Sequence, residues 1–306
     1  MKFGVGMLNS VQIKAMKLPE WQKSVTHAQQ AEALRLADEL GYWKISVPEH
    51  FVIPREHVEL SGEHYPHATT ALGYIAGLTK QAKLSSCITI LPLLHPIAQA
   101  KMWATLDWLS NGRAVMNAAV GWLEEEFELM GVNFHERGRL CDEYIEAIIE
   151  LWTSDHPTYE GKYVSFRDVG FAPKPVQKPM PIWFGGDAPA VQRRIARFGA
   201  GWQPFLTPPD KLPESMDYIR SQKDYHGGPI ELSYSITTLR LGHGHVPRDA
   251  TRAEGEWTNA AEVIDLVGQL KELGVTETSI PPPTLVDFEA YLDWLRWGAE
   301  EVMRKV

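Results

Sequence analysis

The sequence predicts an α/β fold in which eight parallel strands, each followed by a helix, close into a (β/α)8 TIM barrel. Short apolar strands alternate with amphipathic helices eight times along the 306 residues, and parallel neighbours need such crossover connections. Glycine follows a helix and precedes a strand in "ELGY", "RFGAGW" and "ELGVTE", where it accommodates the left-handed turn that ends a helix. The length suits one closed barrel, so we expect residues 1–306 to form a single domain.

An open, doubly wound sheet is the alternative interpretation of the same alternation. That fold is usually marked by G-x-G-x-x-G directly after the first strand. The segment "GVGMLN" lacks the third glycine and has no helix directly behind it. The closed barrel is therefore favoured.

The individual elements follow from the spacing of apolar residues. Strands are expected at residues 3–7, 43–47, 84–91, 114–120, 182–185, 201–205, 232–239 and 276–280. Apolar residues at three- and four-residue spacing, such as Ala31, Leu34 and Ala37, predict the helices. These are expected at residues 24–41, 69–81, 96–109, 139–153, 189–198, 209–224, 260–273 and 286–304.

Two long connections interrupt this rhythm. Residues 48–68 follow the second strand, and residues 154–181 precede the fifth. The latter segment contains "YEGKYVSF", typical of a small hairpin, and then the proline-rich "FAPKPVQKPMP". Because long insertions in a compact domain are usually functional, we expect both to shape a substrate pocket.

Composition excludes several classes of function. The net charge is −9 and the basic residues are not clustered, which argues against a nucleic-acid partner. No apolar run approaches about eighteen residues, so no membrane span is expected. The start, "MKFGVGMLNS", lacks the pattern of a signal peptide. Two cysteines, Cys87 and Cys141, are too few for a disulfide framework, which favours the cytoplasm.

The first candidate for chemistry is the segment "KISVPEHF", in which an apolar strand ends in Glu49 and His50. Active sites of such barrels lie at the carboxyl ends of the strands. A histidine of near-neutral pKa suits proton transfer, and a neighbouring carboxylate can hold its tautomer. We therefore expect Glu49 and His50 to be catalytic, the alternative being an ordinary loop pair.

The second candidate is "PIWFGGDAPAVQRR", where a strand runs through Gly185 and Gly186 into a helix. Paired glycines let the backbone approach an anion, and the start of the helix offers free N–H groups. This geometry favours phosphate binding. The alternative is a plain tight turn in which Asp187 caps the helix and occupies those donors.

The third candidate is the end of the fourth strand, at Gly121 and Trp122, followed by Glu124, Glu125 and Glu126. Acidic residues suit the first turn of a helix, so this run is most simply a solvated helix start. One of the three reaching into the site is the less favoured interpretation.

Histidines also recur in a pattern that could hold zinc. Glu-His occurs three times at seven-residue spacing, His67 lies nearby, and His243 and His245 form "HGH" near the seventh strand. No cysteine joins them, and histidine-rich loops are often solvated. We expect no metal site.

With these motifs in view, the sequence resembles the luciferase-like monooxygenase superfamily along nearly its whole length. The resemblance is densest in residues 91–152 and 159–202, and "ATLDWLSNGR", "GWLEEEF", "FAPKPVQKP" and "PIWFGG" are most similar to the branch that uses coenzyme F420. It implies a (β/α)8 barrel with F420, or alternatively FMN, as cofactor.

The resemblance also implies residue roles. The acid–histidine pair near the reactive ring matches Glu49 and His50, and a non-proline cis peptide behind the ring matches the bond between Cys87 and Ile88. The remaining cofactor-lining positions match Thr89, Gly121, Trp122, Glu125, Gly185, Gly186, Ala188 and Thr207. Deazaflavin sugar-phosphate dehydrogenases carry an acid where this chain has Trp122, which puts that activity in doubt.

The function we expect is F420-dependent hydride transfer with a small organic substrate. The alternative within the superfamily is an FMNH2-dependent monooxygenase. Alternatives of another class are a metal-dependent barrel hydrolase and a non-catalytic flavin-binding protein. The superfamily tendency to pair through barrel helices implies a homodimer.

Overall fold

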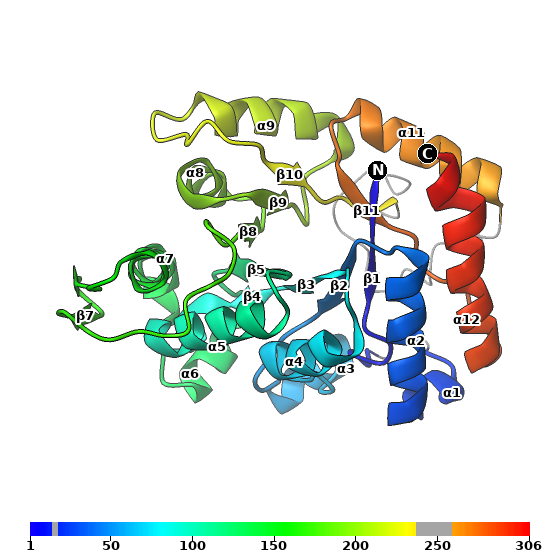
Figure 1. Ribbon diagram of the computed structural model, residues 1–306, viewed down its shortest axis with the longest axis horizontal. Coiled ribbons are helices and arrows are strands. Elements are labelled where there is room, and N and C mark those ends of the chain that lie inside the picture. Colours follow the sequence, from blue (N-terminus) through cyan, green and yellow to red (C-terminus); the bar gives the residue numbers. More distant parts are fainter. Residues whose placement is uncertain (14–17, 237–258) are drawn as a thin grey trace.

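The computed structural model describes residues 1–13, 18–236 and 259–306 (Figure 1). Parallel strands form its centre in the sheet order β10-β9-β8-β5-β3-β2-β1-β11. A parallel bridge between Ser233 and Glu277 joins the two ends of that order. Backbone bonds from Thr276 N to Leu232 O (2.9 Å) and from Tyr234 N to Glu277 O (3.0 Å) reinforce it. The predicted barrel is therefore confirmed.

The strand bounds agree within two residues with those expected, apart from the third strand and from the seventh, which ends at Leu232. The strands of the barrel are β1 (Lys2–Gly6), β2 (Lys44–Val47), β3 (Lys83–Ser86), β4 (Thr89–Ile90), β5 (Ala114–Ala119), β8 (Ile182–Gly185), β9 (Gly201–Gln203), β10 (Glu231–Leu232) and β11 (Glu277–Ser279). The predicted strand 84–91 is divided into β3 and β4 at Cys87 and Ile88. The end of the predicted strand 232–239, and the histidines His243 and His245, lie outside the described residues.

Helices cover the outside of the barrel (Figure 1). They are α1 (Glu20–Lys23), α2 (His27–Leu40), α3 (Val58–Ser61), α4 (Ala68–Leu78), α5 (Pro96–Leu109), α6 (Glu124–Leu129), α7 (Arg137–Thr153), α8 (Pro189–Phe198), α9 (Leu212–Ser221), α11 (Ala260–Glu272) and α12 (Phe288–Trp297). Helix α6 is absent from the predicted helix ranges, although the three consecutive glutamates had suggested that a helix starts there. None of the described helices is long and apolar enough to cross a membrane.

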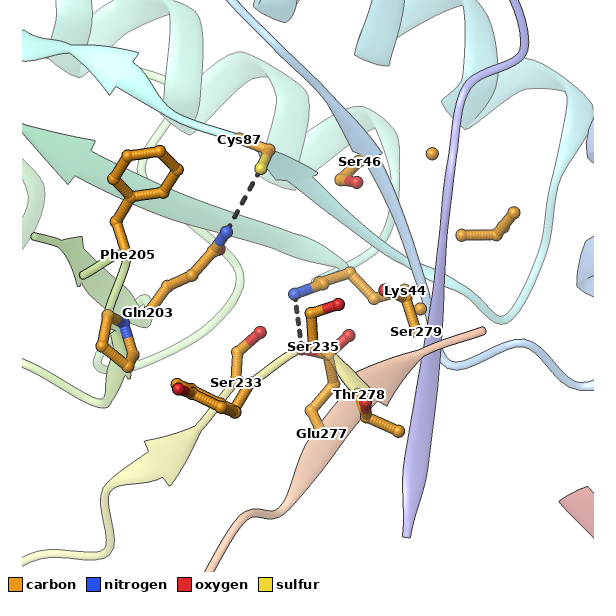
Figure 2. A pocket seen from close by; sticks show the side chains of 15 residues that line it. Lys44, Ser46, Cys87, Gln203, Phe205, Ser233, Ser235, Glu277, Thr278 and Ser279 are labelled. Atoms are coloured by element: carbon orange, nitrogen blue, oxygen red, sulfur yellow. Dashed lines mark hydrogen bonds and ion pairs between the residues drawn. The ribbon is translucent and has the colours of Figure 1, made fainter. Parts of the chain in front are cut away.

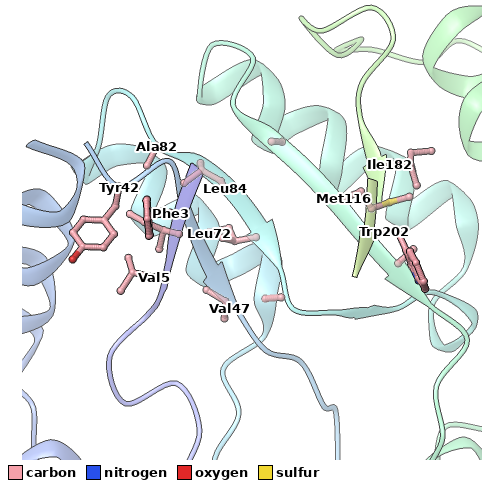
Figure 3. Packing of buried hydrophobic residues seen from close by; sticks show 14 of the residues in the cluster. Phe3, Val5, Tyr42, Val47, Leu72, Ala82, Leu84, Met116, Ile182 and Trp202 are labelled. Atoms are coloured by element: carbon pink, nitrogen blue, oxygen red, sulfur yellow. The ribbon is translucent and has the colours of Figure 1, made fainter. Parts of the chain in front are cut away.

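The main hydrophobic core lies between the strands and these helices. Phe3, Leu72 and Leu84 are among its buried members (Figure 3). Side chains of a strand alternate between two faces, so apolar residues such as Ile45 and Val47 face the helices while their neighbours face the barrel interior. Packing of these apolar side chains against the helices therefore fixes which strand residues face the barrel interior.

The two insertions lie in different parts of the molecule. Residues 48–67 contain α3 and lie beside the end of β2. The second insertion forms the hairpin β6 (Tyr159–Glu160) and β7 (Ser165–Phe166), which lies against α7, away from the strand ends (Figure 1). Glu143 of α7 accepts hydrogen bonds from backbone N–H groups of residues 162–164. The expectation that this insertion shapes the pocket is therefore wrong, because its polar backbone is satisfied on the outside of the barrel.

Candidate active site

The loops that leave β2, β4, β5 and β8 meet at the carboxyl ends of the strands. The rings of His50 and Trp122 lie 6.0 Å apart, edge to face. The side chain of Ile88 lies directly against Gly185. The four predicted segment ends are thus neighbours in two pairs at the rim where barrel enzymes carry their chemistry.

His50 is held by a carboxylate from a different segment of the chain. Its Nδ1 lies 2.8 Å from Oε2 of Glu126. The other oxygen, Oε1, accepts from the backbone N–H of Phe51 at 2.7 Å and of Val52 at 3.3 Å. The Glu126 side chain is 1% exposed and that of His50 is 12% exposed. Helix α6 therefore fixes both the imidazole and the chain that follows it.

This contact corrects two expectations. The partner of His50 is Glu126, not Glu49, and one of the three consecutive acids does reach the site. The Glu49 carboxyl instead accepts from the backbone N–H of Ile90 at 3.3 Å. The physical reason is that adjacent residues of an extended chain point to opposite sides. Burial raises the pKa of Glu49 to about 7, although backbone N–H groups of Ile90 and Ala68 oppose the rise.

Aromatic rings surround His50. Tyr65 meets the imidazole edge-on with ring centres 4.9 Å apart. Trp122 also contacts a second imidazole, since the ring centre of His57 is 6.1 Å from its own. Glu125, predicted to line the cofactor, has its Oε1 3.3 Å from Nε2 of His57. These contacts place Trp122 and Glu125 at the same rim as His50.

The peptide bond between Cys87 and Ile88 is cis, as the resemblance implies. Cys87 is a free, partly exposed thiol, and Nε2 of Gln203 donates to its sulfur at 3.3 Å. Thr89 is buried, and its hydroxyl donates to Oγ of Ser86 at 2.9 Å. Cys87 thus faces an open space, while the hydroxyl of Thr89 is used within the barrel wall.

Gly121 and Gly185 allow close packing around the cis peptide bond between Cys87 and Ile88. A Cβ added to Gly185 would lie 3.0 Å from a methyl of Ile88. One added to Gly121 would lie 2.6 Å from the ring of Phe127 and 2.8 Å from Ile90. Gly121 also has a φ of +82°, which side-chain-bearing residues rarely adopt. The sequence needs glycine at both positions for this wall of the site.

Asp187, directly after the two glycines at the end of β8, binds the loop that follows β9. Its Oδ1 accepts from Phe205 N, from Thr207 N at 2.8 Å and from the Thr207 hydroxyl at 2.6 Å. Asp187 therefore does not cap α8, whose N-cap is Ala188 and has no side-chain cap. Gly186 has a φ of +117°. The alternative in which Asp187 occupies the donors of the helix is wrong.

A cavity of about 270 Å³ opens inside the barrel, between β9, β10, β11, β1 and β2 (Figure 2). Cys87 and Gln203 form one side of it. On the other side Lys44 and Glu277 form a buried ion pair, with Nζ 2.9 Å from Oε2. None of residues 154–181 lines this cavity.

Small side chains leave this space empty of protein. The lining includes Gly4, Gly6, Ser46, Ser233, Ser235 and Ser279. A Cβ added to Gly6 would meet no atom within 4 Å. Barrel interiors are normally filled by bulky branched side chains. The open interior is therefore a feature of this sequence and large enough for a ring system, since a cavity of about 150 Å³ already holds benzene.

Two tryptophans of the barrel strands, Trp183 of β8 and Trp202 of β9, lie away from the mouth of the barrel. Trp183 is 1% exposed and stacks on Trp43, with the Lys44 ammonium 4.7 Å from its ring centre. Trp202 is fully buried and donates from Nε1 to Gly186 O at 2.8 Å. Both support the barrel rather than face its mouth.

The repeated Glu-His pairs do not assemble into one cluster. Among the residues that the structure describes, no group of three His, Cys, Asp or Glu side chains is placed to hold a metal ion. His64 instead lies 3.1 Å from Asn9 O, and Arg55 pairs with Glu63 at 3.6 Å.

Sequence reasoning missed several residues of the site. Glu126 could have been singled out because Phe127, the next residue, begins an apolar pattern that buries one side of α6. Lys44 and Glu277 are charged residues inside apolar strands, a signal of a polar barrel interior. Gln203, whose Oε1 accepts from Asn117 Nδ2 at 2.7 Å, had no distinguishing signal.

This arrangement agrees with a comparison of the sequence with known families. Residues 1–276 match the family model described as luciferase-like monooxygenase. The chain belongs to the luciferase-like monooxygenase family. The predicted family and fold are both confirmed.

Relatives within the luciferase-like family differ in cofactor. The chain is 34% identical over 281 residues to Rv0953c of Mycobacterium tuberculosis, covering 87% of this chain and 92% of that protein. It is 32% identical to the FMNH2-dependent dimethylsulfone monooxygenase of Pseudomonas putida, covering 58% of this chain and 50% of the relative. It is 31% identical to the F420-dependent glucose-6-phosphate dehydrogenase of Amycolatopsis mediterranei, covering 54% and 50%.

Solved structures agree on the luciferase-like fold. The monooxygenase RslO1 of Streptomyces bottropensis superposes with a TM-score of 0.77 at 23% identity, covering 100% of this chain and 99% of that one. The F420-dependent tetrahydromethanopterin reductase of Methanopyrus kandleri gives 0.71 at 17% identity, covering 99% of each. These matches support the barrel and leave the choice of cofactor open.

Proposed function

We propose that this protein is an oxidoreductase that uses coenzyme F420 to transfer hydride to or from a small organic molecule. The observation that carries the proposal is the open cavity with Cys87 on its wall, at the end of the barrel where the loop that carries His50 also lies. The similarity of "GWLEEEF" and "FAPKPVQKP" to the deazaflavin branch favours F420 over FMN.

The residues present fit such a cofactor. The cavity has space for a flat ring system, and Gly6 on its surface is exposed, so the space is open to solvent. Ile88, Gly121 and Gly185 would form the wall behind the ring. The uncapped start of α8 at Ala188, next to Gly186, would receive the phosphorylated tail, because free N–H groups at a helix start bind anions.

When bound, the deazaflavin ring supplies the hydride acceptor or donor. The protein's own contribution is proton transfer by His50. As a hydride leaves an alcohol carbon, the imidazole Nε2 would remove the hydroxyl proton. Trp122 and Tyr65 would exclude water from one side. Glu49 is assigned no step, because its carboxyl is directed to backbone N–H groups.

The same site could serve an FMNH2-dependent monooxygenase, and the Pseudomonas relative favours this second candidate. We propose to distinguish the two by titrating purified protein with F420 and with FMN while following quenching of the cofactor fluorescence. Tighter binding of F420, without oxygen uptake during turnover, supports hydride transfer. Tighter binding of FMN, with oxygen uptake when the flavin is reduced, supports the monooxygenase.

The role of His50 is tested by replacing it and a neighbouring histidine in parallel. His50→Ala should lower turnover at least a hundredfold, within the range of general acid–base contributions, and change cofactor affinity little. His57→Ala is the matched control, because His57 also contacts Trp122 and a glutamate of α6. Turnover is followed as F420 reduction with glucose 6-phosphate and with a panel of neutral secondary alcohols. Unchanged turnover in His50→Ala rejects the assignment.

A homodimer is also proposed. Tyr74 of α4, and Ile97, Trp108 and Leu109 of α5, are exposed apolar side chains on two helices that contact each other. Light scattering on the protein and on Trp108→Glu should give two subunits and one, respectively. A monomer before substitution contradicts the proposal. A cytoplasmic location stays a prediction.

A further inference from the structure

Helix α6 begins with three consecutive glutamates, and each meets a different imidazole. Glu124 lies 3.4 Å from His135, Glu125 lies 3.3 Å from His57, and Glu126 lies 2.8 Å from His50. The first two carboxylates are 47% and 42% exposed, whereas Glu126 is 1% exposed. N–H···O bonds weaken beyond about 3.2 Å. Only the contact between Glu126 and His50 is therefore short and removed from water.

Both oxygens of Glu126 are used by one stretch of chain. Oε2 faces Nδ1 of His50, while Oε1 accepts from the next two backbone N–H groups, those of Phe51 and Val52. A carboxylate only accepts hydrogen bonds, so the nitrogen that faces it must carry the hydrogen. His50 is then the Nδ1–H tautomer, and its Nε2 is left with a free lone pair.

We propose that Glu126 is the positioning residue of this site, which holds His50 in the Nδ1–H tautomer and turns its Nε2 toward the substrate. This inference rests on the proposed role of His50 as a base. It identifies the Glu126 carboxylate as the group that keeps Nε2 of His50 free to accept a proton. Tyr65 packs edge-on against the imidazole. Glu49 is close enough to Glu126 for the two charges to interact, but its hydrogen bonds go elsewhere.

The bond from Glu126 to the backbone adds a second constraint. Because the same carboxylate fixes Phe51 N and Val52 N, the backbone that carries His50 is held beside Oε2 of Glu126. A neutral amide at position 126 can still accept from these N–H groups through its oxygen. However, its NH2 group would then face Nδ1 as a donor, which favours the opposite tautomer.

The tautomer can be measured directly, without substrate or cofactor. A long-range proton–nitrogen correlation spectrum of protein labelled with nitrogen-15 in histidine separates the two neutral forms. It is recorded at about pH 8.5, well above the ordinary histidine pKa of about 6.5. The signals of His50 are assigned by their loss in His50→Gln. We expect the Nδ1–H form in the unsubstituted protein, and the Nε2–H form as the spectrum of that protein would overturn the inference.

Three variants then test the cause. Glu126→Gln should shift His50 to the other tautomer or to a mixture, and Glu126→Asp should keep Nδ1–H at least in part. Glu124→Gln is the matched control on the same helix turn, because its carboxylate contacts His135 instead, and it should leave His50 unchanged. An unchanged His50 signal in folded Glu126→Gln also overturns the inference. If that variant does not fold, the spectrum of the unsubstituted protein still decides.

Kinetics provide the second measurement. Glu126→Gln should lower kcat about tenfold or more, as expected for loss of an orienting partner, with cofactor affinity within about threefold. Glu124→Gln should change neither kcat nor cofactor affinity. A protein that binds neither F420 nor FMN refutes the proposed function, whereas the spectra test the tautomer independently. The two failures are therefore distinguishable.

Discussion

The two halves of the barrel differ in how densely side chains fill the interior. On β10, β11, β1 and β2, inward positions two residues apart carry glycine, serine and one ion pair, so the interior is hollow. Around the ends of β3, β5 and β8, glycines allow Ile88 and its neighbours to pack closely. The same barrel geometry thus gives space on one side and a rigid wall on the other. Where a glycine lies decides whether its missing side chain makes room for a ligand or for protein.

The largest effect should come from the ion pair in the hollow half. Lys44→Met leaves Glu277 buried without its partner, which typically costs about 3–5 kcal/mol in the free energy of unfolding. The double variant Lys44→Met/Glu277→Leu should recover much of that loss. Urea unfolding of the three proteins checks this. Equal stability of the single variant and the original protein would mean that the pair is not desolvated.

Glu49, just past the end of β2, provides the contrasting buried charge, since its partners among the described residues are backbone N–H groups and not a cationic side chain. Burial raises its pKa from 4.5 to about 7. The raised pKa means that ionised Glu49 destabilises the fold increasingly as pH rises from 4.5 to 7. Glu49→Gln should therefore raise the free energy of unfolding by about 1–3 kcal/mol at pH 8 and by much less at pH 4.5. Thermal unfolding at the two pH values measures this, and a larger gain at the lower pH would contradict it.

A matched pair of glycine substitutions compares the halves directly. Gly185→Val must displace Ile88, and overpacking of this kind costs about 1–3 kcal/mol. Gly6→Val enters open space, so its unfolding free energy should change little. Denaturant midpoints of both variants provide the test. Comparable losses at the two positions would remove the distinction between the halves.

The smallest effect on stability should come with a clear effect on binding. Gly6→Val fills part of the cavity and should weaken F420 or FMN binding about tenfold, equivalent to about 1.4 kcal/mol. Gly73→Ala on α4 is the control, since its added Cβ also meets no atom within 4 Å but lies outside the cavity. Fluorescence titration measures both. Undiminished affinity in Gly6→Val would place the ring elsewhere.

The fold was predictable because periodicity is local. Alternating strands and helices, with glycine after helices, could be read within short windows. The break at Cys87 and Ile88 could not, because an apolar run such as "LSSCITILP" carries no mark of where pairing stops. That division was suggested only by the resemblance to a family.

The site was predictable in position but not in its contacts. His50 could be placed because strand ends define the active rim. Its partner could not, because Glu126 is distant in sequence while Glu49 is adjacent. Likewise, Lys44 and Glu277 are 233 positions apart. Such pairs are created by closure of the barrel, and no spacing rule along one chain reveals them.

Two exposed aromatic rings at the mouth of the barrel should affect the heat capacity of ligand binding. Trp122 is 57% exposed and Phe205 is 65% exposed, although rings of this size normally favour burial. A flat ligand stacked on them removes that surface from water. Its association should therefore show a negative change in heat capacity, visible as a binding enthalpy that grows more favourable on warming.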